Sequence, residues 1–301
     1  MRALGNFIFQ GRLQAIGVTS FLTIISLLLP PLSYLLSGVP VSLVTLRRGP
    51  VYGMQVIIGS LLVMMLFALL ANINPQIATA FAIGVWAPVW LCANVLRSTA
   101  SHGALMLAAG ALGAVYILVT HLLLGDVSGW WQNWIDTLVT QSLTVDQAEH
   151  YREAITAAAP FLNAMMAAGL VISMVLTALI ARWWQSMLYH PGGFRKEFYA
   201  LQLPRGLLLV VLLGIGLVFM GEAKPGSIVL DMMILLVFIY LFQGVASIHR
   251  FIAARGLPAI WLLMIYTLLF ILPQMILFVA CLGIVDSCYA RAKLKDGNDN
   301  S

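Results

Sequence analysis

Long apolar runs separated by short polar stretches constrain this chain more than any other feature. A helix needs roughly 20 residues to cross about 30 Å of hydrocarbon. Six clear runs approach or exceed that length: 51–71, 75–96, 104–124, 157–181, 206–221 and 228–248. Backbone polar groups in hydrocarbon must be paired within their own segment, which favours helices over open strands. The runs therefore predict an all-α integral membrane protein.

The charge of the chain supports the same assignment. Charged residues make up only 9% of the 301 positions, too few to cover the surface of a water-soluble fold, in which they reach about 25%. The net charge of +5 comes from basic residues placed singly or in pairs at the ends of apolar runs. In that position they indicate membrane orientation rather than binding to nucleic acid.

The two ends of the chain decide the predicted topology. The run 13–46 is interrupted by Pro30 and Pro31, and the run 257–285 by Pro273. If both runs are divided there, fourteen Lys and Arg residues lie on one side of the membrane and two on the other, whereas undivided runs give nine and seven. Because Lys and Arg gather in short cytoplasmic loops, we favour divided runs. The prediction is about eight full transmembrane helices plus a C-terminal hairpin or re-entrant segment bent at Pro273, with both termini cytoplasmic in a bacterial inner membrane.

We expect a single polytopic membrane domain over 1–301. Its parts are a first helical group 13–124, an outer connector 125–156, a second helical group 157–290 with an inner loop 182–205, and a polar cytoplasmic tail 291–301.

The outer connector is acidic and begins with Trp130, Trp131 and Trp134. Tryptophans suit the headgroup layer, so we expect an amphipathic helix lying on the outer leaflet. Thr144 and Gln147 have the spacing of a capping box that would start a second helix. A solvated connector and a lid over a binding cavity are the two alternatives for this region.

The sequence offers no catalytic motif. It lacks a phosphate-binding loop, a nucleophile elbow and a zinc-binding H-E-x-x-H helix. Its five histidines fall near span ends or in loops, where we expect wet or interfacial side chains. The three cysteines have no spacing for a metal site or a disulfide. No enzyme, metal or cofactor is predicted.

Polar residues inside apolar spans are costly and are therefore candidates for function. Asn94 and Arg97 share one helix, and Tyr240 and Gln243 share another. Asp286 lies beside the end of the last segment. These five are the candidate ligand-binding residues. The alternative is interhelical hydrogen bonding, worth under about 2 kcal/mol each, and for Asp286 an ion pair with an arginine of the preceding loop, Arg250 or Arg255.

Basic residues on the predicted inner side are candidates for contact with lipid or a partner protein. Arg47 and Arg48 precede a Gly-Pro turn, and Arg195 and Lys196 lie in an aromatic-rich inner loop. Such composition is typical of segments anchored by aromatic rings and anionic lipid. Docking of a partner protein is the alternative.

Small residues recur every four positions at Gly11, Ala15, Thr19 and Thr23. Such a stripe allows close approach of another helix. Packing inside the protein and docking of a partner subunit both predict it.

Two sets of motifs resemble known families. The segment 37–53, SGVPVSLVTLRRGPVYG, resembles the junction between the second and third helices of S components of energy-coupling factor transporters. The segments 191–204, PGGFRKEFYALQLP, 241–258, LFQGVASIHRFIAARGLP, and 282–286, LGIVD, are similar to the YybS-like family of bacterial membrane proteins without an established activity. The first resemblance implies a cavity open to the outer side, with transport driven by a separate membrane subunit and ATPases.

These observations predict a transporter-like inner-membrane protein that binds a small, apolar or weakly polar solute, as a substrate-binding subunit dependent on partners. The alternative is a membrane scaffold or regulatory protein that binds other proteins or lipid.

Overall fold

The computed structural model describes residues 2–29, 32–142 and 145–298, and these ranges contain helices and turns but no strand. Five helical spans are long and apolar enough to cross a membrane: Pro50–Leu70, Gln76–Thr99, His102–Leu124, Arg152–Tyr189 and Ile228–Ala254. Four further apolar helices are shorter: Arg12–Leu28, Gly206–Phe219, Ile260–Ile271 and Gln274–Tyr289. The all-α class is confirmed, but five described helices, not about eight, reach spanning length by themselves.

The chain forms two compact units, and each is built from two separate segments. Unit 1 comprises Met1–Ala109 and Ile172–Leu201, and unit 2 comprises Gly110–Val171 and Gln202–Ser301. The division falls inside the helices α7, His102–Leu124, and α9, Val145–Tyr189. The second half of α9 therefore belongs with the N-terminal helices.

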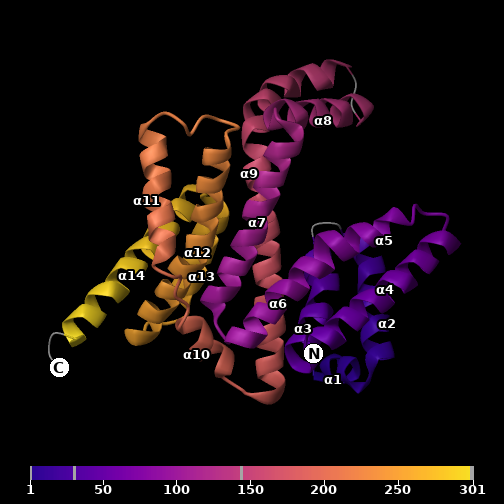
Figure 1. Ribbon diagram of the computed structural model, residues 1–301, viewed down its shortest axis with the longest axis horizontal. Coiled ribbons are helices and arrows are strands. Elements are labelled where there is room, and N and C mark those ends of the chain that lie inside the picture. Colours follow the sequence, from indigo (N-terminus) through magenta and orange to yellow (C-terminus); the bar gives the residue numbers. More distant parts are fainter. Residues whose placement is uncertain (1, 30–31, 143–144, 299–301) are drawn as a thin grey trace. The chain divides into compact units, whose positions relative to one another are not determined.

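Unit 1 is organised around α3. Its own helices are α1 Arg2–Gln10, α2 Arg12–Leu28, α3 Val39–Arg48, α4 Pro50–Leu70, α5 Gln76–Phe81, α6 Ala87–Thr99 and α10 Gly193–Tyr199, with π-helical turns at Tyr34–Gly38 and Ala82–Trp86 (Figure 1). All eight residues of α3 from Val39 to Leu46 are buried, because α2, α4 and α6 pack around it. A helix covered on every side is the centre of a bundle.

A tight turn joins α3 to α4, as the sequence indicates. Gly49 adopts a φ of 100°, which a residue with a side chain rarely does. Pro50 then occupies the first helical position of α4, where its missing N–H leaves no bond unmade. Pro30 and Pro31, the other predicted break in this region, lie outside the described residues.

The stripe of small residues packs inside unit 1. Ala15, Thr19 and Thr23 are fully buried, and α2, which carries them, packs against α4. The two hydroxyls donate to backbone carbonyls one turn earlier, at 2.8 and 2.7 Å. Internal packing is therefore what the stripe does in this structure.

Unit 2 contains parts of α7 and α9 together with α8 Val127–Ser142, α11 Gly206–Phe219, α12 Ile228–Ala254, α13 Ile260–Ile271 and α14 Gln274–Asn298. The closest helix pair is α12 with α14. Gly244 on α12 lies against the carbonyl oxygen of Val279, and Gly283 on α14 lies against the carbonyl oxygen of Tyr240. The two backbones touch because neither glycine has a side chain to separate them.

The last helices form a hairpin. Tyr240 meets Gly283 and Gln243 meets Asp286, so α12 and α14 run in the same direction and the short α13 provides the return (Figure 1). Pro273 lies between α13 and α14. The twelve residues of α13 rise only about 18 Å, well short of a full crossing of about 30 Å. The chain therefore bends at Pro273 between the short α13 and the longer α14, whose apolar part is Gln274–Tyr289.

The outer connector 125–156, expected to carry helices, and the stretch 182–205, expected to be a loop, are both largely helical. The connector 125–156 consists of α8 and the beginning of α9, and Thr144, the expected cap, lies outside the described residues. The loop 182–205 is likewise occupied by the end of α9 and by α10. An unbroken run of helix-compatible residues carries α9 past the apolar region, because the next glycines come only at Gly192 and Gly193.

Candidate functional site

An apolar cleft lies between α12, α13 and α14 in unit 2. Its volume is about 770 Å³, and its walls include Ile248, Phe251, Trp261, Phe278, Leu282 and Val285. Ser247 and Asp286 bring polar atoms to the lining. Ligand sites typically combine such an apolar wall with a few placed polar groups, so this cleft is the candidate functional site.

A polar network fixes Asp286 at this cleft. The Nη2 of Arg250 donates to both carboxylate oxygens at 2.6 Å, and the Nε2 of Gln243 donates to Oδ2 at 2.9 Å. Gln243 in turn accepts from the backbone N–H of Leu203 at 3.0 Å, and Arg250 also donates to Ser247 at 2.8 Å. Several donors on one carboxylate hold it in one position.

The exposure of these groups differs along the network. The amide of Gln243 is fully buried, whereas the side chains of Arg250 and Asp286 are 27% and 25% exposed. Asp286, which lines the cleft, is thus bonded on its buried side by Gln243 and stays partly exposed. It can meet a polar group on a molecule whose apolar part fills the cleft.

The structure brings together some of the predicted ligand-binding residues. Gln243 and Asp286 are directly bonded, and the arginine that pairs with Asp286 is Arg250. Tyr240 is fully buried at the crossing of α12 and α14. Arg255 lies over the ring of Phe251 instead, at 5.1 Å.

The other two predicted residues, Asn94 and Arg97, lie on α6 of unit 1. The Nη1 of Arg97 donates to the carbonyl of Leu46 at 2.9 Å. That carbonyl is in the last turn of α3, where carbonyls lack helical partners and favour a cation. In this structure Arg97 therefore caps α3.

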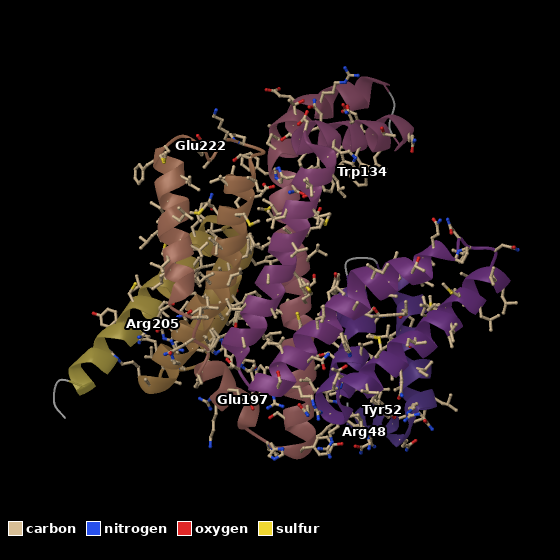
Figure 2. The ribbon with its side chains drawn as sticks, viewed as in Figure 1. Arg48, Tyr52, Trp134, Glu197, Arg205 and Glu222 are labelled. Carbon is tan, nitrogen blue, oxygen red and sulfur yellow. The ribbon has the colours of Figure 1, made fainter. Side chains whose placement is uncertain are left out.

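The basic residues of unit 1 make local contacts at the ends of its helices. The Arg47 guanidinium lies 4.1 Å from the ring centre of Tyr189. Arg48 donates to the carbonyl of Phe9 at 3.1 Å and also lies near Tyr52 (Figure 2). On α10, Arg195 donates to the phenol of Tyr199 at 3.0 Å, and Lys196 follows it.

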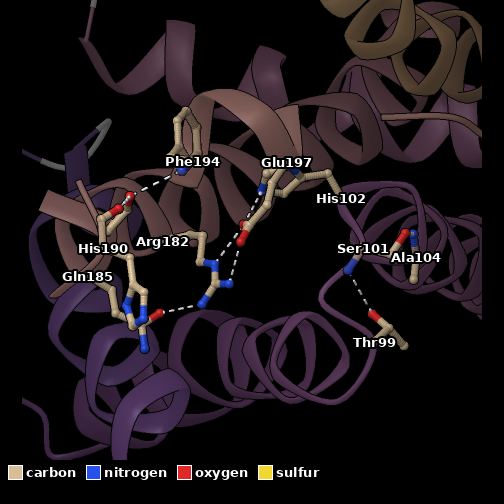
Figure 3. A network of polar contacts seen from close by, with 10 residues as sticks. Thr99, Ser101, His102, Ala104, Arg182, Gln185, His190, Phe194 and Glu197 are labelled. Carbon is tan, nitrogen blue, oxygen red and sulfur yellow. Dashed lines mark hydrogen bonds and ion pairs between the residues drawn. The ribbon is translucent and has the colours of Figure 1, made fainter. Parts of the chain in front are cut away.

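A second polar network, absent from the sequence-based expectations, joins α9 to α10 in unit 1 (Figure 3). Arg182 donates two hydrogen bonds, of 2.8 and 2.6 Å, to the carboxylate of Glu197. It also donates to the side-chain oxygen of Gln185 at 2.7 Å. A small pocket of about 270 Å³ lies here, lined by Arg47, Arg182, Ser186, Tyr189, His190 and Glu197 among others.

His102 corrects the expectation of wet histidines. Its side chain is fully buried, with its ring 5.5 Å from that of Phe194 and 6.2 Å from that of Phe198 (Figure 3). The aromatic residues of α10 cover it. The sequence could not indicate this because α10 follows His102 by about ninety positions.

The sequence-based expectations also omitted a buried carboxylate. Asp231 on α12 is fully buried, and its Oδ2 lies 2.9 Å from Nε2 of His121 and 2.6 Å from Nδ2 of Asn163. The signal was present: Asp231 is an acidic residue within the apolar run 228–248, and such residues are functional candidates. His121, expected to be wet, is half of this pair.

Comparison with known proteins adds one relation. No curated protein and no solved structure matches the chain. Residues 17–287, which cover most of both units and every lining residue of the cleft except Tyr289, match the family described as predicted membrane protein (DUF2232). The chain belongs to the DUF2232 family of membrane proteins.

Proposed function

We propose that this membrane protein binds a small apolar or amphipathic molecule in the cleft between α12, α13 and α14, in a transporter-like role without catalysis of its own. The observation that carries the proposal is an apolar cleft of about 770 Å³ with one carboxylate, Asp286, in its wall, held there by an ion pair with Arg250. The apolar walls favour hydrocarbon, and the ion pair orients a polar end.

We also propose that the protein depends on an energy-coupling subunit. This dependence is supported by the resemblance of 37–53 to S components, and by the absence of an ATP-binding motif from the sequence. The buried stripe on α2 weighs against docking through that helix, because Ala15, Thr19 and Thr23 already pack within unit 1. A partner would need another surface.

Filling the cleft tests the proposal. Leu282 is 50% exposed in the cleft, so Leu282→Trp should displace a bound molecule while the fold is kept. We expect native mass spectrometry of the full chain, purified in mild detergent, to show a small molecule on the wild type that is lost from this variant. Leu212→Trp on α11, at a position 63% exposed and outside the cleft lining, is the matched control. Equal occupancy in both variants contradicts the proposal.

A second candidate function is binding of anionic lipid or an acidic partner by unit 1. It is favoured by the pocket beside Arg47 and Arg182, two guanidinium groups of the kind that bind phosphate. The same mass spectra separate the candidates: phospholipid adducts that Arg47→Gln removes favour unit 1, and a small molecule that Leu282→Trp removes favours the cleft.

We also propose a bacterial inner-membrane location with both termini cytoplasmic, on the basis of the positive-inside rule. Reporter fusions at Ser301 and within 182–205 should then report cytoplasm, and a fusion near Val145 the outer side. A periplasmic signal at Ser301 contradicts this orientation.

A further inference from the structure

Among the described residues, the Asp231 carboxylate of unit 2 is paired with a positive charge only when His121 is protonated. The side chain is 1% exposed and that of His121 is 15% exposed. Both contacts to its Oδ2 come from side chains that can be neutral, the imidazole of His121 and the amide of Asn163. Its other oxygen, Oδ1, is buried and has no hydrogen-bond partner among the described residues.

Burial of an ionised carboxylate with neutral partners alone is costly, and the cost rises in a membrane-spanning helix. Asp231 lies in the first turn of α12, where the helix dipole contributes only about half a positive charge. Arg250 supplies a full positive charge to Asp286, the other carboxylate with a described network in this unit. No arginine or lysine among the described residues forms an ion pair with Asp231.

One added proton removes this imbalance in either of two places. On the imidazole it creates a cation 2.9 Å from Oδ2. On Oδ1 it turns an unpartnered acceptor into a donor and neutralises the carboxyl. The proton therefore belongs to the pair rather than to either residue.

We propose that Asp231 and His121, positioned by Asn163, form a proton-binding site in unit 2, and that the proton enters and leaves through the imidazole. The more exposed member of the pair is His121, and an imidazole can accept a proton on one nitrogen while it donates from the other. The proton comes from water and returns to it, so no further reactant is needed. This site does not depend on solute binding in the cleft.

The surroundings leave few other groups to carry the titration. On α7 the titratable residues of unit 2 are Tyr116, which lies within electrostatic reach of Asp231, and His121 itself. The apolar turns of α9 around Asn163 carry no ionisable residue, and the first two turns of α12 carry none besides Asp231. A phenol stays neutral near pH 7, which leaves the pair itself.

Solid-state NMR of the full chain in lipid bilayers tests the site. With ¹³C-labelled aspartate and ¹⁵N-labelled histidine, we expect the Asp231 carboxyl and the His121 ring to shift together as pH moves between about 5 and 8. Asp286, held by Arg250, serves as the internal control and should not shift. In Asp231→Asn, the pH dependence of the His121 ring signal should change, because its carboxylate partner is removed.

A second variant keeps the test decisive if Asp231→Asn does not fold. In His121→Gln the Asp231 signal should lose the shift that it shared with His121. The proposal is overturned if Asp231 stays constant across the range while His121 titrates independently. It is also overturned if the Asp231 signal follows sodium concentration at fixed pH, because the site would then hold a metal cation.

Discussion

The two units solve the problem of polar groups in a membrane protein differently. Of the 16 basic and 11 acidic residues in the chain, unit 1 holds eight basic residues and one acidic residue, Glu197, and unit 2 holds the other eight and ten. Arginines of unit 1 bind backbone carbonyls and aromatic rings at helix ends. The described carboxylates Asp231 and Asp286 of unit 2 lie in helices with polar partners.

This contrast suggests different roles for the charged residues: membrane anchoring in unit 1 and binding in unit 2. Arginine at a helix end can extend its charge toward headgroups while its stem stays apolar, and so unit 1 has the features of a membrane anchor. A carboxylate inside a helical bundle does not set the orientation of the protein in the membrane as helix-terminal arginines do. It is therefore a stronger candidate for a functional group. Unit 2 therefore carries the proposed cleft and the proposed proton-binding site, whereas the candidate pocket for anionic lipid or an acidic partner lies in unit 1.

The largest effect should come from the helix crossing in unit 2. In Gly244→Ala the new methyl group meets the backbone oxygen of Val279, which cannot move without its helix. We expect destabilisation of about 3 kcal/mol and a lower midpoint of thermal unfolding in detergent. Gly216→Ala on α11, with no atom within 4 Å of the added carbon, is the control.

Gly59→Ala extends this test to unit 1. There the added methyl meets the Ile16 side chain, which can rotate away, so the midpoint should fall less than in Gly244→Ala. If the unfolding midpoint falls equally in the two variants, the backbone contact at Gly244 is no more restrictive than the side-chain contact at Gly59.

The next effect compares two ion pairs of similar exposure, Arg250 with Asp286 and Arg182 with Glu197. Arg250→Gln and Arg182→Gln should each destabilise by about 2 kcal/mol, less than the 3–5 of a fully buried pair. Only Arg250→Gln should also lower the occupancy of a small molecule in native mass spectra, because Arg250 fixes Asp286 at the cleft. If Arg182→Gln lowers that occupancy equally, the division of roles is wrong.

A smaller effect concerns the start of α12. Ser227 accepts from the N–H of Leu230, whereas α4 of unit 1 begins at Gly49 without a side-chain cap. Ser227→Ala should cost about 1 kcal/mol and speed hydrogen exchange of the first-turn amides of α12. Ser227→Asp keeps an acceptor and should restore protection, and exchange that stays fast in it argues against a capping role.

The smallest effect belongs to the cation–π contact of unit 1. Arg47→Gln should lower stability by about 0.5–1 kcal/mol, measured as the unfolding midpoint, because Arg47 lies 4.1 Å from the ring centre of Tyr189. When Tyr189 is already replaced by leucine, Arg47→Gln should lower the unfolding midpoint little further. Additive losses in the double variant show that the two residues do not interact.

Much of the helical architecture could be predicted from the sequence. Five of the six long runs became helices of spanning length, since a backbone in hydrocarbon has few alternatives to the helix. The sixth, 206–221, became the shorter α11. The breaks at Gly49 and Pro273 also follow from local chemistry, because glycine alone adopts a positive φ easily and proline cannot continue a helix. Asp286 and Gln243 were identifiable as polar residues within or beside apolar runs.

Local sequence did not decide which helices pack together. The partner of Asp231 is 110 positions away on α7, and the rings that cover His102 come from α10. The division into units falls inside α7 and α9, where no change of composition marks it. Hydrophobicity determines that a segment enters the membrane. The neighbours of each helix depend on the fit of surfaces such as Gly244 against Val279, which exist only after the chain has folded.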